Sequence, residues 1–136
     1  MKKKFSNKWN GSKQPRKQRK YRANAPLHTR VKMIAGHLAK TLREKYGKRS
    51  FNLRKGDSVK VMSGEFKGKT GKIALVNKNK LKVAIEGIQR AKKDGTKVNV
   101  LFDGSNLQIQ ELNLDDKKRL KSLNKEKTKI EGEDKK

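Results

Sequence analysis

Lysines alternate with glycines in residues 56–76, a segment that reads GDSVKVMSGEFKGKTGKIALV. Glycine allows positive φ angles and leaves backbone N–H groups uncovered, so the chain can fold sharply and approach a ligand closely. Lysine ammonium groups at this spacing suit phosphate oxygens, and nothing beside them forms a catalytic pair. We predict a phosphate-binding loop, in which Phe66 either packs in the loop or stacks on a base. Its predicted contacts are Gly64, Phe66, Lys67, Gly68, Lys69, Gly71 and Lys72.

The first 55 residues hold 19 basic residues and one acid, Glu44, for a net +18 of the chain's +26. Basic residues interleaved with Trp9 and Tyr21 favour RNA or DNA, because cations pair with phosphates and aromatic rings stack on bases. A solubilising tail or a localisation signal is the alternative for residues 1–25. The predicted contacts in this part, with one more in a later hairpin, are Arg16, Lys17, Arg19, Lys20, Arg22, Arg30, Lys32, Arg49, Arg54 and Arg90.

Residues that would indicate other chemistry are missing or isolated. The chain has no cysteine, which excludes disulfides and thiolate metal sites. His28 and His37 have no carboxylate or cysteine at ligand spacing, and Asp57, Glu65 and Glu86 form no carboxylate pair. We therefore expect no enzymatic activity, no metal ion, no cofactor and no small-molecule substrate. The chain also has neither a signal peptide nor an apolar run of about 20 residues, which predicts a cytoplasmic protein without a membrane partner.

Positioning the lysine-rich loop requires strands on both sides of it. Apolar and polar residues alternate over several short segments, as expected for half-buried strands, and glycine-containing turns such as Asp94-Gly95 separate them. Five or six short strands without an intervening helix predict a mainly β fold, a small SH3-like barrel over residues 48–112. The alternating residues are Val59, Val61, Ile73, Leu75, Leu81, Val83, Ile85, Val98, Val100, Phe102, Leu107 and Ile109.

Three further segments flank the predicted barrel. Residues 1–25 are predicted to form a basic extended arm that becomes ordered on a polyanion. An apolar stripe at spacings of three and four predicts one amphipathic N-terminal α-helix over residues 26–47, which begins at Pro26 and ends at Gly47. Residues 113–136 are predicted to form a short C-terminal helix and a charged tail. The helical stripe consists of Leu27, Val31, Ile34, Leu38 and Leu42.

The lysine-rich segment resembles a KOW motif, which ribosomal proteins and transcription elongation factors share. The matching residues are Gly56-Asp57, Val59, Val61, Gly64, Lys67-Gly68, Gly71 and Ile73. Three further segments make the resemblance more specific: Asn24 to His28, Leu42 to Ser50, and Gln89-Arg90 with Asp94-Gly95-Thr96. From about Pro15 to Leu120 the chain resembles the universal large-subunit ribosomal protein twenty-four family in its archaeal form, which is similar to the eukaryotic protein twenty-six.

This resemblance implies a structural constituent of the large ribosomal subunit. Such a protein binds large-subunit (23S) rRNA directly near its 5′ end, helps to nucleate subunit assembly, and lies at the outer rim of the polypeptide exit tunnel. The implied partners are this rRNA and neighbouring large-subunit proteins, without homo-oligomer formation. The alternative is a KOW-type transcription elongation factor module that binds RNA polymerase or RNA. The high charge, and the lack of an αβ-type domain before the motif, argue against that alternative.

Overall fold

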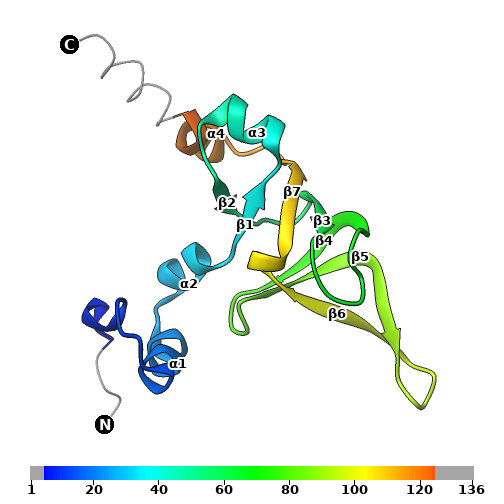
Figure 1. Cartoon of the computed structure of the whole chain (residues 1–136), viewed down its shortest axis with the longest axis horizontal. Helices are drawn as coiled ribbons and strands as arrows, with labels where there is room; N and C mark the ends of the chain where they lie inside the picture. Colours follow the sequence, from blue (N-terminus) through cyan, green and yellow to red (C-terminus); the bar gives the residue numbers. More distant parts are fainter. Residues whose placement is uncertain (1–4, 125–136) are drawn as a thin grey trace.

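The computed structural model describes residues 5–124, which form one mostly antiparallel sheet with helices toward its β1–β2 end (Figure 1). The predicted charged tail lies largely outside the described residues, as does the beginning of the predicted arm. The elements are η1 (Asn7–Trp9), α1 (Pro15–Asn24), α2 (Leu27–Met33), β1 (Ala35–Leu38), α3 (Lys40–Tyr46), β2 (Ser50–Asn52), β3 (Ser58–Val61), β4 (Thr70–Asn77), β5 (Lys82–Ala91), β6 (Lys97–Asp103), η2 (Gly104–Asn106), β7 (Leu107–Glu111) and α4 (Lys117–Asn124).

The sheet has the strand order β2-β1-β7-β3-β4-β5-β6. Consecutive antiparallel pairings join β3 to β4, β4 to β5, and β5 to β6. Strand β7 returns to β3, with Val59 opposite Ile109, and its other edge pairs in parallel with β1, with Leu38 opposite Ile109. The predicted strands and the C-terminal helix are therefore confirmed. This strand order leaves β2 and β6 as edges, so the closed SH3-like barrel stays a prediction.

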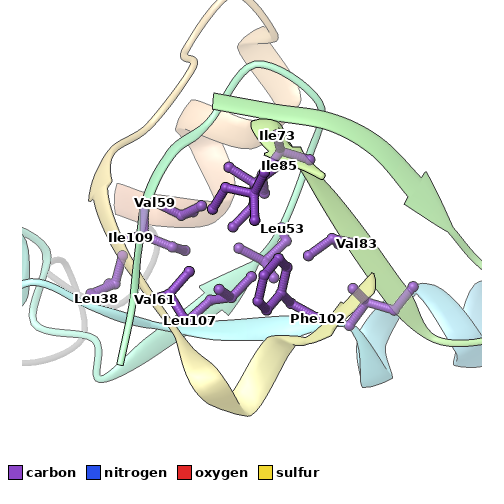
Figure 2. Packing of buried hydrophobic residues seen from close by; sticks show 12 residues of the cluster. Leu38, Leu53, Val59, Val61, Ile73, Val83, Ile85, Phe102, Leu107 and Ile109 are labelled. Carbon is purple, nitrogen blue, oxygen red and sulfur yellow. The ribbon is translucent and has the colours of Figure 1, made fainter. Parts of the chain in front are cut away.

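The core is built by the period-two alternation of the strands. Val59, Val61, Val83, Leu107 and Ile109 are fully buried, and their side chains converge in Figure 2 with those of the neighbouring strands. Burying one large aliphatic side chain contributes roughly 1.5–3 kcal/mol, so this cluster is the main source of the fold's stability. The buried cluster is Ile34, Leu38, Leu53, Val59, Val61, Ile73, Val83, Ile85, Ile88, Phe102, Leu107 and Ile109.

The prediction of one helix over residues 26–47 is wrong. The segment instead forms α2, β1 and α3. Its apolar residues also fit a strand, because Ile34, Gly36 and Leu38 alternate, and all three are buried. A Cβ added to Gly36 would lie 3.0 Å from Leu53 Cδ2 and 3.3 Å from the Leu107 carbonyl oxygen, so glycine suits this tightly packed strand. Pairing with β7 satisfies backbone groups that a helix would have satisfied locally. The predicted end at Gly47 is confirmed, since Gly47 terminates α3 with φ +65°.

The prediction of an extended arm over residues 1–25 is also corrected by the described part of that segment. Residues 15–24 form α1, in which Pro15 occupies a first-turn position where its missing N–H costs nothing. The ring of Tyr21 in α1 is buried and lies 5.1 Å from that of Phe5, centroid to centroid. The sequence showed few apolar residues here, but two aromatic rings suffice to anchor one short helix.

A buried ion pair joins the C-terminal helix to the sheet. Arg119 on α4 donates from Nη1 to Asp57 Oδ1 at 2.6 Å and from Nη2 to Asp57 Oδ2 at 2.7 Å. The same guanidinium donates to the carbonyl oxygens of Asn113 and Asn52, at 2.7 and 3.0 Å. Both side chains are buried, so their charges are compensated by each other and by these backbone groups. This Asp57–Arg119 clamp gives Asp57, in the Gly-Asp pair of the motif, a structural role.

Candidate nucleic-acid interface

The second half of the lysine-rich loop between β3 and β4 forms backbone hydrogen bonds within the protein. Gly68 N–H donates to the Val61 carbonyl at 2.8 Å, and Lys69 N–H donates to the Phe66 carbonyl at 3.1 Å. These N–H groups are therefore engaged, contrary to the expectation that they lie open to a ligand. Gly64 and Gly68 have φ angles of +88° and +89°, which only glycine adopts readily. Residues 67–69 of the loop therefore offer an anion their exposed side chains more than their backbone.

Gly71 supports the fold by close packing. A Cβ at this position would lie 2.7 Å from Ile85 Cγ2 and 3.0 Å from the Glu86 carbonyl oxygen. The close approach that the structure shows is to strand β5, and the predicted contact of Gly71 with RNA stays a prediction. The neighbouring Lys67 and Lys72 are exposed, and their side chains make no hydrogen bond or ion pair within the described residues.

Phe66 packs against the body of the protein. It is half-buried, and its ring meets that of Phe102 edge-on with the centroids 6.0 Å apart. The ammonium group of Lys69 lies 5.1 Å from the Phe66 ring centroid. Of the two roles considered for Phe66, the structure shows packing. Its contact with a base, and that of Lys69 with a phosphate, stay predictions.

Helix α1 presents its cations outward from a braced support. Gln18 Nε2 lies 3.1 Å from the carbonyl oxygens of Trp9 and Asn10 and 2.7 Å from that of Ser12, so its amide folds the preceding loop onto the helix. Lys20 Nζ lies 5.9 Å from the Trp9 ring centroid. The structure thus brings five predicted RNA contacts onto one short helix, all exposed: Arg16, Lys17, Arg19, Lys20 and Arg22.

Three other predicted contacts are engaged inside the protein. Arg30 donates to the carbonyl oxygens of Ala25 and Ala23 and to Asn79 Oδ1, which ties α2 to the β4–β5 turn. Arg90 forms an ion pair with Glu65 across the loop. These guanidinium groups position neighbouring segments in the free protein.

Arg54 is the third engaged arginine, paired with Asp116 at 2.6 Å. The hydrogen bond from Arg54 lowers the pKa of Asp116 below its ordinary value. Asp116 also accepts the Lys118 N–H at 2.8 Å, at the start of α4. The pair therefore joins the beginning of α4 to the connection before β3.

The last two predicted contacts, Lys32 and Arg49, come from different elements and line the same hollow. Figure 1 shows α1 at one side of the molecule, whereas the tip of the β5–β6 hairpin projects from the opposite side. The predicted contacts are therefore distributed over several faces and form no single pocket.

Two structural residues around this surface were not found from the sequence. Arg119 stands four residues before Leu123, which places both on one helical face, and this spacing was the available signal for its burial. Gln18 gives no such signal, because its three acceptors are main-chain atoms.

Within residues 5–124 no three histidine, cysteine, aspartate or glutamate side chains gather as a metal site. None of the helices described is both long and apolar enough to cross a membrane.

Comparison with known proteins relates the chain to one family. The model of the ribosomal proteins L26 (eukaryotic) and L24 (archaeal) matches residues 12–126. A large ribosomal subunit protein uL24 from Methanosphaera stadtmanae is 43% identical over 114 residues, which cover 84% of this chain and 97% of the relative. The uL24 protein of Korarchaeum cryptofilum is 42% identical over 120 residues, or 88% of this chain and 92% of the relative. The chain therefore belongs to the family of eukaryotic L26 and archaeal L24 ribosomal proteins.

Proposed function

We propose that this protein is a non-enzymatic constituent of the large ribosomal subunit that binds large-subunit rRNA directly. The observation that carries the proposal is α1, where five exposed cations are held on a helix anchored by buried Tyr21. Few acids oppose them, since residues 1–55 contain a single acidic residue. Such a surface matches the phosphate density of folded RNA. Family membership supports large-subunit rRNA as the partner in this proposal.

The finer assignment follows the family resemblance. We place the binding site near the 5′ end of the large-subunit rRNA, with a role in starting subunit assembly and a position at the outer rim of the polypeptide exit tunnel. Neighbouring large-subunit proteins are the expected protein partners. The sheet, as a small SH3-like barrel, would serve as the rigid body that fixes the cationic segments relative to one another.

Most contacts in this proposal go to phosphate and sugar. Exposed α1 cations, with Lys67 and Lys72 of the loop, neutralise phosphates and release counterions, so that affinity falls steeply as salt rises. Double-helical RNA is then read through its shape, because its deep major groove excludes side chains. Arg30, Arg54 and Arg90 can contribute only where RNA displaces or joins their internal partners.

The test is a salt titration of binding to overlapping fragments of large-subunit rRNA. We expect the tightest binding on a fragment from the 5′ region, and crosslinks from α1 to its nucleotides. Replacing Arg16 and Arg19 by Gln should weaken binding and reduce the slope of log K against log salt by about 2. Replacing Lys78 and Lys80 by Gln removes the same charge from the β4–β5 turn and serves as the matched control. Equal binding to all fragments would contradict the proposed site.

The transcription-factor alternative has no structural observation in its favour. The matched relatives are covered over 92–97% of their own length, so the likeness extends along whole ribosomal proteins and beyond the KOW motif. Co-sedimentation separates the two functions. We expect the protein to travel with large subunits through a high-salt gradient, whereas a polymerase module would remain at the top or follow the polymerase.

A further inference from the structure

A cationic hollow of about 420 Å³ lies where the end of α2 meets the turn from α3 into β2. This volume falls within the roughly 300–1,000 Å³ range of small-ligand sites. Lys32 comes from α2, Lys48 and Arg49 from the turn, and Ser50 and Asn52 from β2. No acidic side chain of the described chain lines it. The hollow therefore combines three positive charges with two neutral hydrogen-bonding groups.

Two of the three cations are available to a ligand. The side chains of Lys32 and Arg49 are exposed and make no hydrogen bond or ion pair with any residue between 5 and 124. This separates Arg49 from Arg30, Arg54 and Arg90, all of which have partners within the protein. An arginine and a lysine without internal partners, on separate elements beside one hollow, suit a phosphate group between them.

The third cation is fixed as part of the wall. Lys48 Nζ donates to the Ser122 carbonyl of α4 at 2.6 Å and lies 5.5 Å from the Phe51 ring centroid. The Arg119 guanidinium lies 5.4 Å from the same ring. The Phe51 ring thus already contacts two cations, Lys48 and Arg119, and is poorly suited to stack on a base. Recognition in this hollow must come from hydrogen bonding.

Ser50 and Asn52 supply that hydrogen bonding. They stand two residues apart on β2, so both point to one side of the strand, while Phe51 points to the other. Neither side chain has a hydrogen-bond partner in the part of the chain that the structure describes. A hydroxyl and an amide can both donate and accept, as can the ribose 2′-hydroxyl and a base edge.

We infer that this hollow binds one unstacked nucleotide of RNA, with its phosphate between Lys32 and Arg49 and its ribose or base edge against Ser50 and Asn52. The inference rests on the proposed rRNA binding and deepens it, because it names one place where the protein contacts more than phosphate. The Asp57–Arg119 clamp supports the hollow indirectly. It fixes α4 on the sheet, and the Ser122 carbonyl of α4 accepts the hydrogen bond from Lys48.

The first experiment titrates the ¹⁵N-labelled full chain with adenosine 5′-monophosphate, its 2′-deoxy analogue and inorganic phosphate. We expect saturable shifts of the amide signals of Lys32 and residues 47–52, at least threefold tighter for the ribonucleotide than for inorganic phosphate. Weaker binding of the 2′-deoxy analogue assigns the contact to the ribose 2′-hydroxyl, and equal binding of that analogue assigns it to the base edge. The double variant Lys32→Gln, Arg49→Gln should lose these shifts. If all three probes move the same amides with equal affinity, the hollow is a simple anion site and the inference is wrong. Shifts that leave residues 47–52 unmoved would overturn it as well.

The second experiment measures rRNA affinity for the same double variant and for the control Lys78→Gln, Lys80→Gln. We expect at least a tenfold loss for the hollow variant and less than a threefold loss for the control. Equal losses would show that the hollow contributes only diffuse charge, which overturns the inference while rRNA binding stands. If the unmodified chain fails to bind large-subunit rRNA, the proposed function is wrong; the nucleotide shifts at residues 47–52 then decide separately whether the hollow binds a nucleotide.

Discussion

The N-terminal segment and the joint between the sheet and α4 use positive charge in opposite ways. On α1, five cations point outward, and the helix is anchored by Tyr21 and braced by Gln18. At the joint, Arg119 points inward, is only 3% exposed and meets Asp57 with both of its terminal nitrogens. The buried Arg119 thus serves the fold, whereas the exposed cations of α1 are the ones that we propose contact RNA.

The comparison also separates stability from affinity. The buried apolar cluster draws on β1, β3, β4, β5, β6 and β7, whereas α1 buries only Tyr21 of its ten residues. Removing apolar or clamp residues should therefore affect unfolding first, and removing α1 cations should affect binding first. The predictions below test this separation, from the largest expected effect to the smallest.

The clamp gives the largest predicted effect. Replacing Arg119 by Ala leaves the Asp57 carboxylate buried without its partner, and loss of one member of a buried pair costs about 3–5 kcal/mol. We expect urea unfolding to show a loss of that size. The control is Arg54→Ala, which breaks the half-exposed pair with Asp116 and should cost far less, because solvent screens exposed ion pairs. Equal losses for the two variants would refute the distinction between buried and exposed charge.

The clamp also marks a limit of sequence reasoning. The strands around Val59, Ile73, Val83 and Val98 could be predicted, because alternation and turn residues are local signals. The Asp57–Arg119 pair joins positions 62 residues apart, and no local pattern specifies which acid a distant arginine will meet. Family resemblance identified the Gly-Asp pair but gave Asp57 no partner.

Residues 26–47 show the opposite difficulty, in which a local signal was present but ambiguous. Ile34 and Leu38 fit both a helical stripe and a strand alternation. The choice between them depends on β7, a parallel partner from much later in the chain, with His37 opposite Gln108 and Leu38 opposite Ile109. Candidate contacts were predictable as residue types, whereas their internal partners were not, which is why Arg30, Arg54 and Arg90 could not be told from Arg49 by sequence.

Deleting residues 1–25 gives the second largest effect, and it acts on affinity. We expect the shortened chain to keep the dispersed amide spectrum of the sheet, because the core cluster begins at Ile34. Its affinity for rRNA should fall at least 30-fold at physiological salt, with a shallower salt dependence, because the deletion removes all α1 cations. A collapsed amide spectrum would show that the N-terminal segment belongs to the structural part of the protein.

The loop between β3 and β4 should give a smaller loss of affinity. Replacing Lys67 and Lys69 by Ala should weaken rRNA binding several-fold and reduce the salt slope by up to about 2. The ammonium group of Lys69 lies over the Phe66 ring, whereas that of Lys67 has no such contact in the described residues. Single variants should therefore show the larger change for Lys67 in a filter-binding titration. An unchanged slope in the double variant would remove this loop from the interface.

The smallest predicted effect tests whether α1 binds as a braced unit or only as a set of charges. Replacing Gln18 by Ala keeps every cation but removes the amide that contacts the carbonyl oxygens of Trp9, Asn10 and Ser12. Trp9 is the only tryptophan, so its fluorescence should shift to longer wavelength as its loop loosens from α1. In the variant, the loop before α1 must become ordered when RNA binds, and this costs free energy. The rRNA affinity should therefore fall about threefold with an unchanged salt slope. A fluorescence shift without any loss of affinity would show that the charges of α1 suffice for rRNA binding without the brace. The difference between α1 and the Asp57–Arg119 clamp would then lie in burial alone and not in preorganisation of α1.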